Sequence, residues 1–318
     1  MGNLFPTLLY EHFKKISLYK LSYLLRKEIK VHYKKVKGIL SSSNGMNLYR
    51  GCLHGCIYCD SRSDCYHMAH LFEDIEVKEN ALELLDTSLR KKRKLCMIGM
   101  GAMTDPYIPL EDQLLYTRGA LEIIDRNGFG VTLITKSSRV LRDLDVLKSI
   151  QTHSKCVIQM TLTTYDEDLC KILEPNVSTT KERFETLLTL YKEGIPTIVW
   201  LTPILPFIND NEGNLSGILD YCIKAHVKGI ICFDMGVTLR EGNREYFYSK
   251  LEQHFPGLKE TYINKYGNSY ILSSPQNKHL MRIFHQVCEE NGIMHNHEEI
   301  FNYLRTYEDH RLNLLDFI

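Results

Sequence analysis

The chain has 318 residues, a length that suits either two domains or one α/β barrel and is ample for a buried core. Its 39 Lys and Arg residues balance 39 Asp and Glu residues, which excludes a global basic field directed at nucleic acid or an acidic partner. The charge is uneven, because residues 1–37 hold nine Lys or Arg side chains against two Glu, a local net charge of +7. This basic arm is either a solvated surface or a contact for nucleic acid or a membrane surface.

The cysteine content and the lack of long apolar runs indicate the compartment. Ten cysteines are too few for a disulfide scaffold in a chain of this length, and buried thiols in a reducing compartment explain the scattered ones best. No apolar run reaches the roughly 18 residues of a membrane span. The N-terminal residues match neither a secretory signal nor a myristoylation motif. We therefore expect a cytoplasmic protein with no membrane partner.

The predicted elements begin with residues 8–25, where apolar side chains recur at steps of three and four and indicate an amphipathic helix. A short strand is expected over residues 46–50, after a polar break. Further strands are expected at residues 94–99, 130–135, 156–163, 196–201 and 229–234. Helices are expected at residues 79–93, 112–127, 139–150, 166–173, 179–193 and 215–226.

This alternation of apolar strands and helices predicts six βα units. Such units form a parallel sheet covered by helices, and right-handed crossovers curl the sheet into a partial (β/α)6 TIM-like barrel of the α/β class. The rest of the chain reads as helical, with a loop at residues 267–277. We expect a basic amphipathic extension over residues 1–45, the barrel over residues 46–238 and a mostly helical C-terminal appendage over residues 239–318.

Three cysteines after the first strand form a metal-ligand pattern. Cys52, Cys56 and Cys59 are four and then three residues apart in a glycine-punctuated loop. A cubane iron-sulfur cluster normally takes four thiolates, so three close ones leave either a distant fourth ligand or an open iron. Cys65 would complete a four-thiolate zinc site, although structural zinc motifs usually consist of two separated cysteine pairs. A non-catalytic binding module stabilised by zinc or an iron-sulfur cluster therefore stays an alternative.

Polar residues also follow the other predicted strands. In barrels of parallel strands the active site lies at the C-terminal ends of the strands, which is where the cysteine loop is expected. The polar segments at these ends are Thr104-Asp105-Pro106-Tyr107, Thr135-Lys136-Ser137, Thr161 with Thr163, Glu174-Pro175 and Thr202-Pro203. The sequence therefore predicts one polar rim around the cysteine loop.

Together these motifs resemble the radical S-adenosylmethionine (SAM) superfamily. Their order, from Arg50-Gly51-Cys52 through Glu174-Pro175 with Arg183 to Pro203-x2-Pro206, is similar to the spore photoproduct lyase-like branch. The resemblance implies that three thiolates bind a 4Fe-4S cluster and that SAM chelates its fourth iron. It also implies a one-electron donor such as flavodoxin or ferredoxin, which drives cleavage of SAM to a 5′-deoxyadenosyl radical that abstracts hydrogen from a substrate.

The resemblance assigns roles to five further residues. It places Tyr58 at the adenine of SAM, Asp105 and Lys136 at the polar groups of SAM, Thr161 at its methionyl or ribose end, and Glu174 at its ribose hydroxyls. Each residue also has a purely structural interpretation: Tyr58 as packing, Asp105 as a turn residue, Lys136 as a surface cation, Thr161 as a strand residue and Glu174 as a helix end. For His54 we expect an ordinary loop role, and for Cys65 a structural thiol.

Two positions separate the chain from the repair reaction after which the branch is named. That reaction uses a cysteine after the second strand to return hydrogen to the product, and the motif alignment places Ala102 there. The tyrosine that follows the last cluster cysteine is replaced by Asp60. We expect a radical SAM enzyme that is not a spore photoproduct lyase. Its substrate is either a nucleic-acid base or a peptide or small molecule.

Overall fold

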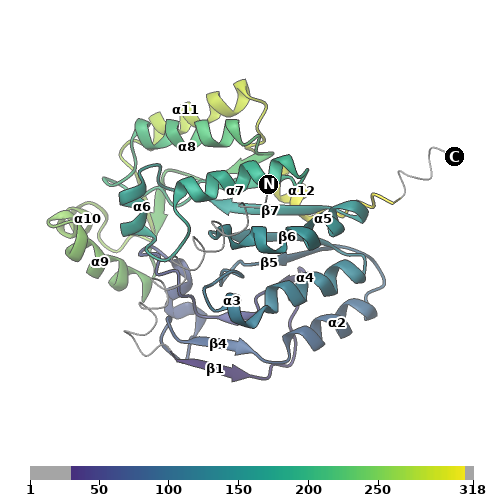
Figure 1. Cartoon of the computed structure of the whole chain (residues 1–318). Coiled ribbons are helices and arrows are strands. Elements are labelled where there is room, and N and C mark those ends of the chain that lie inside the picture. Colours follow the sequence, from purple (N-terminus) through teal and green to yellow (C-terminus); the bar gives the residue numbers. More distant parts are fainter. Residues whose placement is uncertain (1–29, 312–318) are drawn as a thin grey trace, which may run out of the picture.

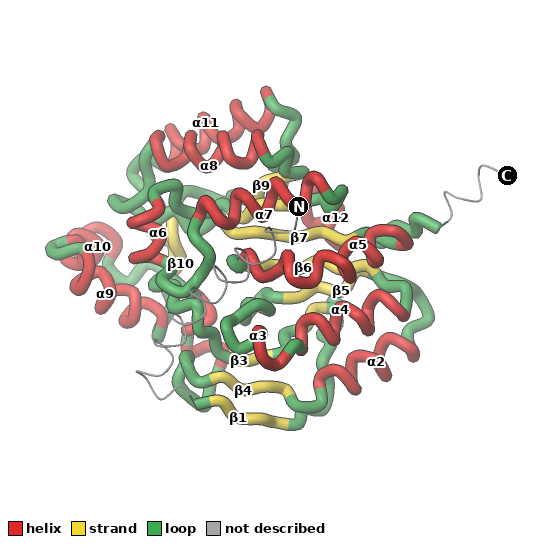
Figure 2. Tube along the Cα trace, viewed as in Figure 1, coloured by secondary structure: helices red, strands yellow, loops and turns green. Residues whose placement is uncertain are grey.

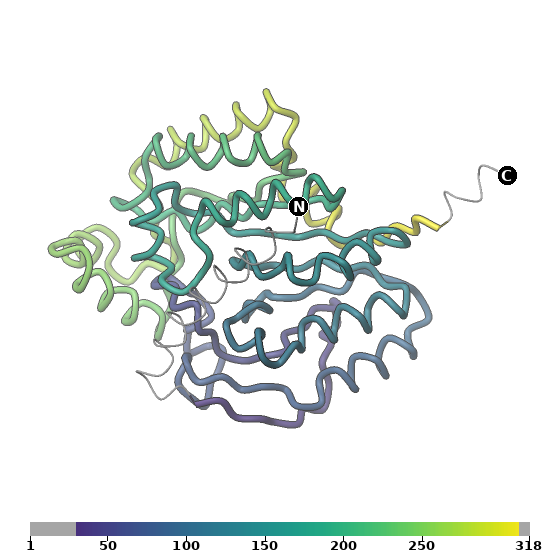
Figure 3. The backbone as a smooth tube through the Cα atoms, in the orientation of Figure 1, coloured from purple at the N-terminus to yellow at the C-terminus, as the bar shows by residue number. Residues whose placement is uncertain are grey.

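The computed structural model describes residues 30–311, and the predicted helix at residues 8–25 lies outside them. Its centre is a six-stranded sheet with the strand order β2-β5-β6-β7-β8-β9, in which every neighbouring pair is parallel. The strands are β2 (Gly45–Met46), β5 (Met97–Met100), β6 (Gly130–Thr135), β7 (Cys156–Thr161), β8 (Thr197–Trp200) and β9 (Gly229–Ile231). Figure 3 shows the chain crossing this sheet in sequence order, from purple to green.

Helices cover the outer face of the sheet, with α4, α5 and α7 lying along it in Figure 1. These helices are α2 (Ala81–Lys91), α3 (Glu111–Leu114), α4 (Tyr116–Arg126), α5 (Leu144–His153), α6 (Glu167–Leu173), α7 (Thr180–Lys192) and α8 (Glu212–Lys224). Short 3-10 helices are η1 (Asp60–Arg62), η2 (Asp64–Tyr66) and η3 (Ser138–Asp143). The predicted α/β class with six βα units is confirmed.

Strand β7 lies in the middle of the sheet, and all six of its residues are buried. The side-chain amide of Gln159 accepts a hydrogen bond from the Trp200 indole N–H at 2.8 Å and donates one to the Thr132 hydroxyl at 2.7 Å. Burial on both faces explains the continuous apolar run that predicted this strand. The strand ends at Thr161, and two residues later the Thr163 carbonyl accepts hydrogen bonds from the side chains of Asn209 and Asn214.

Some elements differ from the expected ones. The predicted helix at residues 112–127 is broken into α3 and α4 at Leu115, whose φ of 53° is left-handed. The predicted strand at residues 46–50 is split into β2 and β3 (Tyr49–Arg50). Strand β3 joins a small second sheet of order β1-β4-β3, with β1 (Val31–Lys34) and β4 (Ile75–Lys78). No local pattern predicts this sheet, because its strands are short and distant in sequence.

The C-terminal part is mostly helical, as expected. It contains α9 (Asn243–His254), α10 (Leu258–Tyr266), α11 (Asn277–Glu290) and α12 (His297–Arg305). Strands β10 (Gly236–Thr238) and β11 (Ile271–Ser273) form an antiparallel pair, so the predicted loop at residues 267–277 contains a strand. Figure 2 shows β10 beside α9 and α10, at one end of the barrel. No helix in the described range is long and apolar enough to cross a membrane.

The predicted boundaries at residues 45 and 238 stay predictions. Strand β1 lies within the expected N-terminal extension, yet it pairs with β4 through residues 31–34. Helix α12 packs Ile300 and Leu304 against Ile231 of β9, which ties the appendage to the edge of the barrel. Both flanking segments therefore contribute to the folded body.

Candidate functional site

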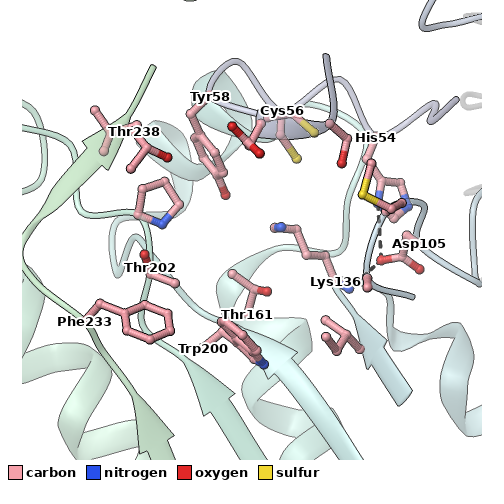
Figure 4. A pocket seen from close by; sticks show the side chains of 18 of the residues that line it. His54, Cys56, Tyr58, Asp105, Lys136, Thr161, Trp200, Thr202, Phe233 and Thr238 are labelled. Carbon is pink, nitrogen blue, oxygen red and sulfur yellow. Dashed lines mark hydrogen bonds and ion pairs between the residues drawn. The ribbon is translucent and has the colours of Figure 1, made fainter. Parts of the chain in front are cut away.

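The C-terminal ends of the strands surround a cavity of about 660 Å³, a size typical of small-molecule sites (Figure 4). One wall comes from the cysteine loop and strands β5 to β7. The opposite wall comes from β8, β9 and the β10-β11 pair. The predicted residues Cys52, Cys56, Cys59, Tyr58, Asp105, Lys136 and Thr161 all line the cavity, whereas Glu174 does not.

Backbone geometry explains why a glycine precedes the first cysteine. Gly51 has a φ of 87°, and a Cβ there would lie 2.4 Å from the Asp74 carbonyl oxygen. Only glycine permits this close approach, which lets the Cys52 N–H donate to the Phe72 carbonyl at 3.0 Å. The cysteine loop is thereby anchored to the segment that leads into β4.

Three of the four closely spaced cysteines lie together at the cavity. Cys52, Cys56 and Cys59 all line it. Cys65 is exposed, lies outside the cavity lining and sits 3.4 Å from a guanidinium nitrogen of Arg240. The cavity thus gathers three cysteines, one fewer than the four ligands of a structural zinc site or the four thiolates of a closed cubane cluster.

Asp105 fastens the end of β6 to the cysteine loop. Its carboxylate accepts hydrogen bonds from the Thr135 hydroxyl at 2.8 Å and from the Lys136 N–H at 2.7 Å. It also accepts from the Tyr107 N–H at 2.8 Å and lies 3.4 Å from Nδ1 of His54. Asp105 is therefore a turn residue, as one interpretation of the sequence expected. It also holds Lys136 and His54 of the cavity wall in position. Its predicted contact with SAM stays a prediction.

His54 is part of this wall, although the sequence led us to expect only an ordinary loop role for it. It is buried, it lines the cavity, and burial lowers the pKa of its imidazole, so the ring is neutral at pH 7. Because Nδ1 faces the Asp105 carboxylate, the proton belongs on Nδ1. The other nitrogen, Nε2, is buried without a hydrogen-bond partner. An orphaned acceptor two residues from two cysteines fits a site that encloses a further group.

Lys136 carries the positive charge of the cavity. Figure 4 shows its side chain reaching toward Tyr58, with Nζ 5.7 Å from the ring centroid. Burial alone lowers the pKa of Lys136, but Cys56, Glu174 and Cys59 raise it overall, so the ammonium stays charged. This location is not that of a surface cation, and a positive charge beside the cysteines favours an anionic group there.

Glu174 lies behind the cavity wall and acts on it indirectly. Its carboxylate accepts hydrogen bonds from the Tyr58 hydroxyl and from the fully buried Arg183. Burial alone would raise the pKa of Glu174, but Arg183 and then Lys136 lower it, so the carboxylate is ionised. Arg183 also donates to the Thr161 carbonyl at 2.7 Å. Glu174 and Arg183 thus hold Tyr58 and the end of β7 in position.

The opposite wall consists largely of half-exposed aromatic and apolar side chains that the sequence did not single out. Phe233 is 50% exposed, Tyr270 45% and Ile271 59%. Trp200 completes this wall from the end of β8. Trp200 and Phe233 lie near the C-terminal ends of the strands predicted at residues 196–201 and 229–234, and this position was the available signal for them. Tyr270 and Ile271 had none, because β11 was not predicted.

Residues 46–216 match the family model described as the radical SAM superfamily. The chain belongs to this superfamily. Radical SAM proteins are enzymes that use SAM together with a 4Fe-4S cluster, which agrees with the cysteine motif. The predicted family is confirmed.

Two of the proteins that are similar in sequence to this radical SAM protein are themselves uncharacterised. A protein of Methanocaldococcus jannaschii is 32% identical over 169 residues, covering 52% of this chain and 62% of that protein. A protein of Mycobacterium tuberculosis is 25% identical over 227 residues, covering 70% of this chain and 66% of that protein. The chain thus spans less than two thirds of the length of either relative.

The fold is that of spore photoproduct lyase. The solved structure of that lyase complexed with dinucleoside spore photoproduct superposes with a TM-score of 0.59 at 14% sequence identity. The superposition covers 82% of this chain and 79% of the lyase. At this identity the likeness concerns the fold alone, so it carries no substrate over to this chain.

Proposed function

We propose that Cys52, Cys56 and Cys59 bind a 4Fe-4S cluster and that SAM binds beside it in the cavity. The observation that carries this proposal is that these three cysteines line one cavity together, while Cys65 is exposed and stays outside it. When bound, the two groups would supply one-electron cleavage of SAM to a 5′-deoxyadenosyl radical, with the electron coming from a flavodoxin or ferredoxin. The exposed position of Cys65 leaves only three of these cysteines at the cavity, which argues against the alternative of a four-thiolate zinc-stabilised binding module.

The remaining residues of the first wall would bind and orient SAM. Lys136 supplies a cation for a carboxylate, and Tyr58 supplies an aromatic face held in place by Glu174. Thr161 offers a hydroxyl at the end of β7. Asp105 acts through Lys136 and His54, whose positions it sets. The buried wall excludes water, which protects a reactive radical from side reactions.

The second wall supports a substrate with a flat or apolar face. Trp200, Phe233 and Tyr270 all line the cavity, and a planar ring stacks on aromatic side chains. Among the described lining residues Lys136 is the only Lys or Arg, against Asp60, Asp105 and Asp234. This balance disfavours a sugar-phosphate backbone inside the cavity. A single base, nucleoside or small ring-bearing molecule fits it better.

The reaction that we propose is not the repair of a thymine lesion. Ala102 lines the cavity where that reaction requires a thiol, and the three proposed cluster ligands are the only described cysteines in the lining. No other described thiol is placed to return hydrogen to a product radical. Efficient repair of the thymine lesion by the purified protein would overturn this exclusion.

The test is anaerobic reconstitution with iron and sulfide, reduction with dithionite and addition of SAM. We expect 5′-deoxyadenosine and methionine in equal amounts, and their absence from cluster-loaded protein would refute the proposal. Deuterated nucleosides, ring-bearing metabolites and peptides then identify the substrate class by transfer of deuterium into 5′-deoxyadenosine.

A further inference from the structure

A second group of potential metal ligands lies away from the cavity, in the small β1-β4-β3 sheet. His32, His70 and Glu76 each point a ligand atom at the others, all within 4.8 Å. Within residues 30–311 this is the group of three or more His, Cys, Asp or Glu side chains that meets this distance. None of the three residues lines the cavity.

The fold brings the three residues together from distant parts of the sequence. His32 of β1 and Glu76 of β4 are direct partners in the parallel register, so their side chains share one face. Nε2 of His32 lies 3.8 Å from a carboxylate oxygen of Glu76. His70 comes from the segment that follows the cysteine loop, and its ring meets His32 edge-on at 4.7 Å between centroids.

The hydrogen bonds of His70 leave one nitrogen ready to bind a metal. Its Nδ1 donates to the Leu71 carbonyl at 2.9 Å, which fixes the proton on Nδ1. The other nitrogen, Nε2, is buried and has no hydrogen-bond partner. Metal-ligating histidines typically donate their second ring nitrogen to a carbonyl or carboxylate in this way. Nε2 of His70 is thus a buried acceptor without a partner, next to a second imidazole and a carboxylate, and a bound cation would satisfy all three groups.

Glu76 provides the negative charge. The residue is 6% exposed, and among residues 30–311 the Lys or Arg side chain that forms an ion pair with it is Lys34, whose Nζ lies 3.3 Å from Oε2 on a side chain that is 59% exposed. Two other cations of this face are occupied elsewhere: Arg50 donates to the His67 carbonyl and Lys78 to the Asn47 carbonyl. Lys34 can turn into solvent at little cost, which frees the carboxylate oxygen for a metal.

We propose that His32, His70 and Glu76 bind a divalent transition metal of the zinc class. Two imidazoles and one carboxylate are the ligands such ions prefer, with bonds of about 2.0–2.2 Å. Closing the ligand atoms around an ion requires side-chain shifts of about an ångström. His32 is 42% exposed, so water completes the coordination from the solvent side.

This metal would fasten the N-terminal strand to the segment behind the cysteine loop. Strand β1 has four residues and lies at the edge of its sheet, where β4 is its partner among the described strands. A metal bridging β1, β4 and residue 70 stabilises that edge and restrains residues 60–74, which connect Cys59 to β4. The site is independent of SAM cleavage, so its failure would leave the proposed function untouched.

The test measures zinc in cluster-loaded protein after incubation with Zn²⁺ and removal of loose metal on a chelating resin. We expect about one zinc per chain, bound by nitrogen and oxygen only in X-ray absorption at the zinc edge. The variants His32→Ala, His70→Ala and Glu76→Gln should lose this zinc and keep their iron and sulfide. The zinc-dependent rise in melting temperature should vanish with it.

His279→Ala is the matched control. His279 pairs with the single carboxylate of Glu212 at 2.6 Å on the surface and should not affect zinc content. A wild-type protein without stoichiometric zinc overturns the proposal, and so do equal zinc contents in all variants or sulfur ligands at the zinc edge. If His70→Ala fails to fold, Glu76→Gln decides, because it keeps the size and shape of the side chain.

Discussion

The two walls of the cavity are built in different ways. The first wall, formed by the cysteine loop and strands β5 to β7, is buried and tied together by hydrogen bonds that run from Asp105 and Arg183. The second wall, formed by β8 to β11, is aromatic and half-exposed at Phe233 and Tyr270. Chemistry that every radical SAM enzyme shares requires fixed geometry, whereas substrates differ. We therefore propose that the first wall serves the cofactors and the second the substrate.

The largest expected effect comes from removing a cysteine of the first wall. Any of Cys52→Ser, Cys56→Ser or Cys59→Ser should lower bound iron severely and abolish SAM cleavage, because two thiolates do not hold a cubane. Iron and sulfide content and 5′-deoxyadenosine formation measure this. Cys65→Ser is the control and should retain both. Equal iron loss from Cys65→Ser would contradict the separation of Cys65 from the site.

The next effect is on the stability of the first wall. Arg183→Met leaves the Glu174 carboxylate buried without its cation, which should cost about 3–5 kcal/mol of unfolding free energy. Denaturant unfolding measures the loss. Lys171→Met removes the cation of the exposed pair with Asp168 and should change the unfolding free energy little. If the two variants were equally stable, the buried pair would not support this wall.

A smaller effect is expected on SAM binding. Lys136→Met should weaken SAM affinity about 10- to 100-fold, since a charge-assisted hydrogen bond is worth about 1.5–3 kcal/mol. Equilibrium binding to cluster-loaded protein measures the change. Lys148→Met, which removes a surface cation paired with Glu193, is the control. Unchanged SAM affinity in Lys136→Met would remove this residue from the cofactor wall.

The smallest effect should come from the second wall. Phe233→Ala should raise the KM of a ring-bearing substrate about 5- to 100-fold, the equivalent of about 1–3 kcal/mol of stacking. SAM affinity should stay close to that of the wild type. Tyr191→Ala removes an aromatic ring of comparable exposure on the outer helix α7 and should change neither quantity. If Phe233→Ala changed SAM affinity and left the KM of the substrate unchanged, the second wall would not be the one that binds substrate.

The sequence predicted the central sheet well where apolar runs are continuous. Strand β6 occupies residues 130–135 as expected, and the helices α6 and α7 lie within one or two residues of their predicted ends. The small β1-β4-β3 sheet and the β10-β11 pair were missed, because each strand has at most four residues and is paired with a distant segment. A short strand acquires its structure from its partner, and the partner is not visible in local periodicity.

By itself the sequence determined the order of the βα units and the three cysteines on one loop, because both depend on local spacing. Only the tertiary structure decided what the polar residues touch. It turned Glu174 toward Arg183, it set His54 against Asp105, and it gathered His32, His70 and Glu76 from two strands and a loop. The physical reason is that burial makes an unpaired polar group costly, so packing selects the partner of each such group among residues far away in the chain.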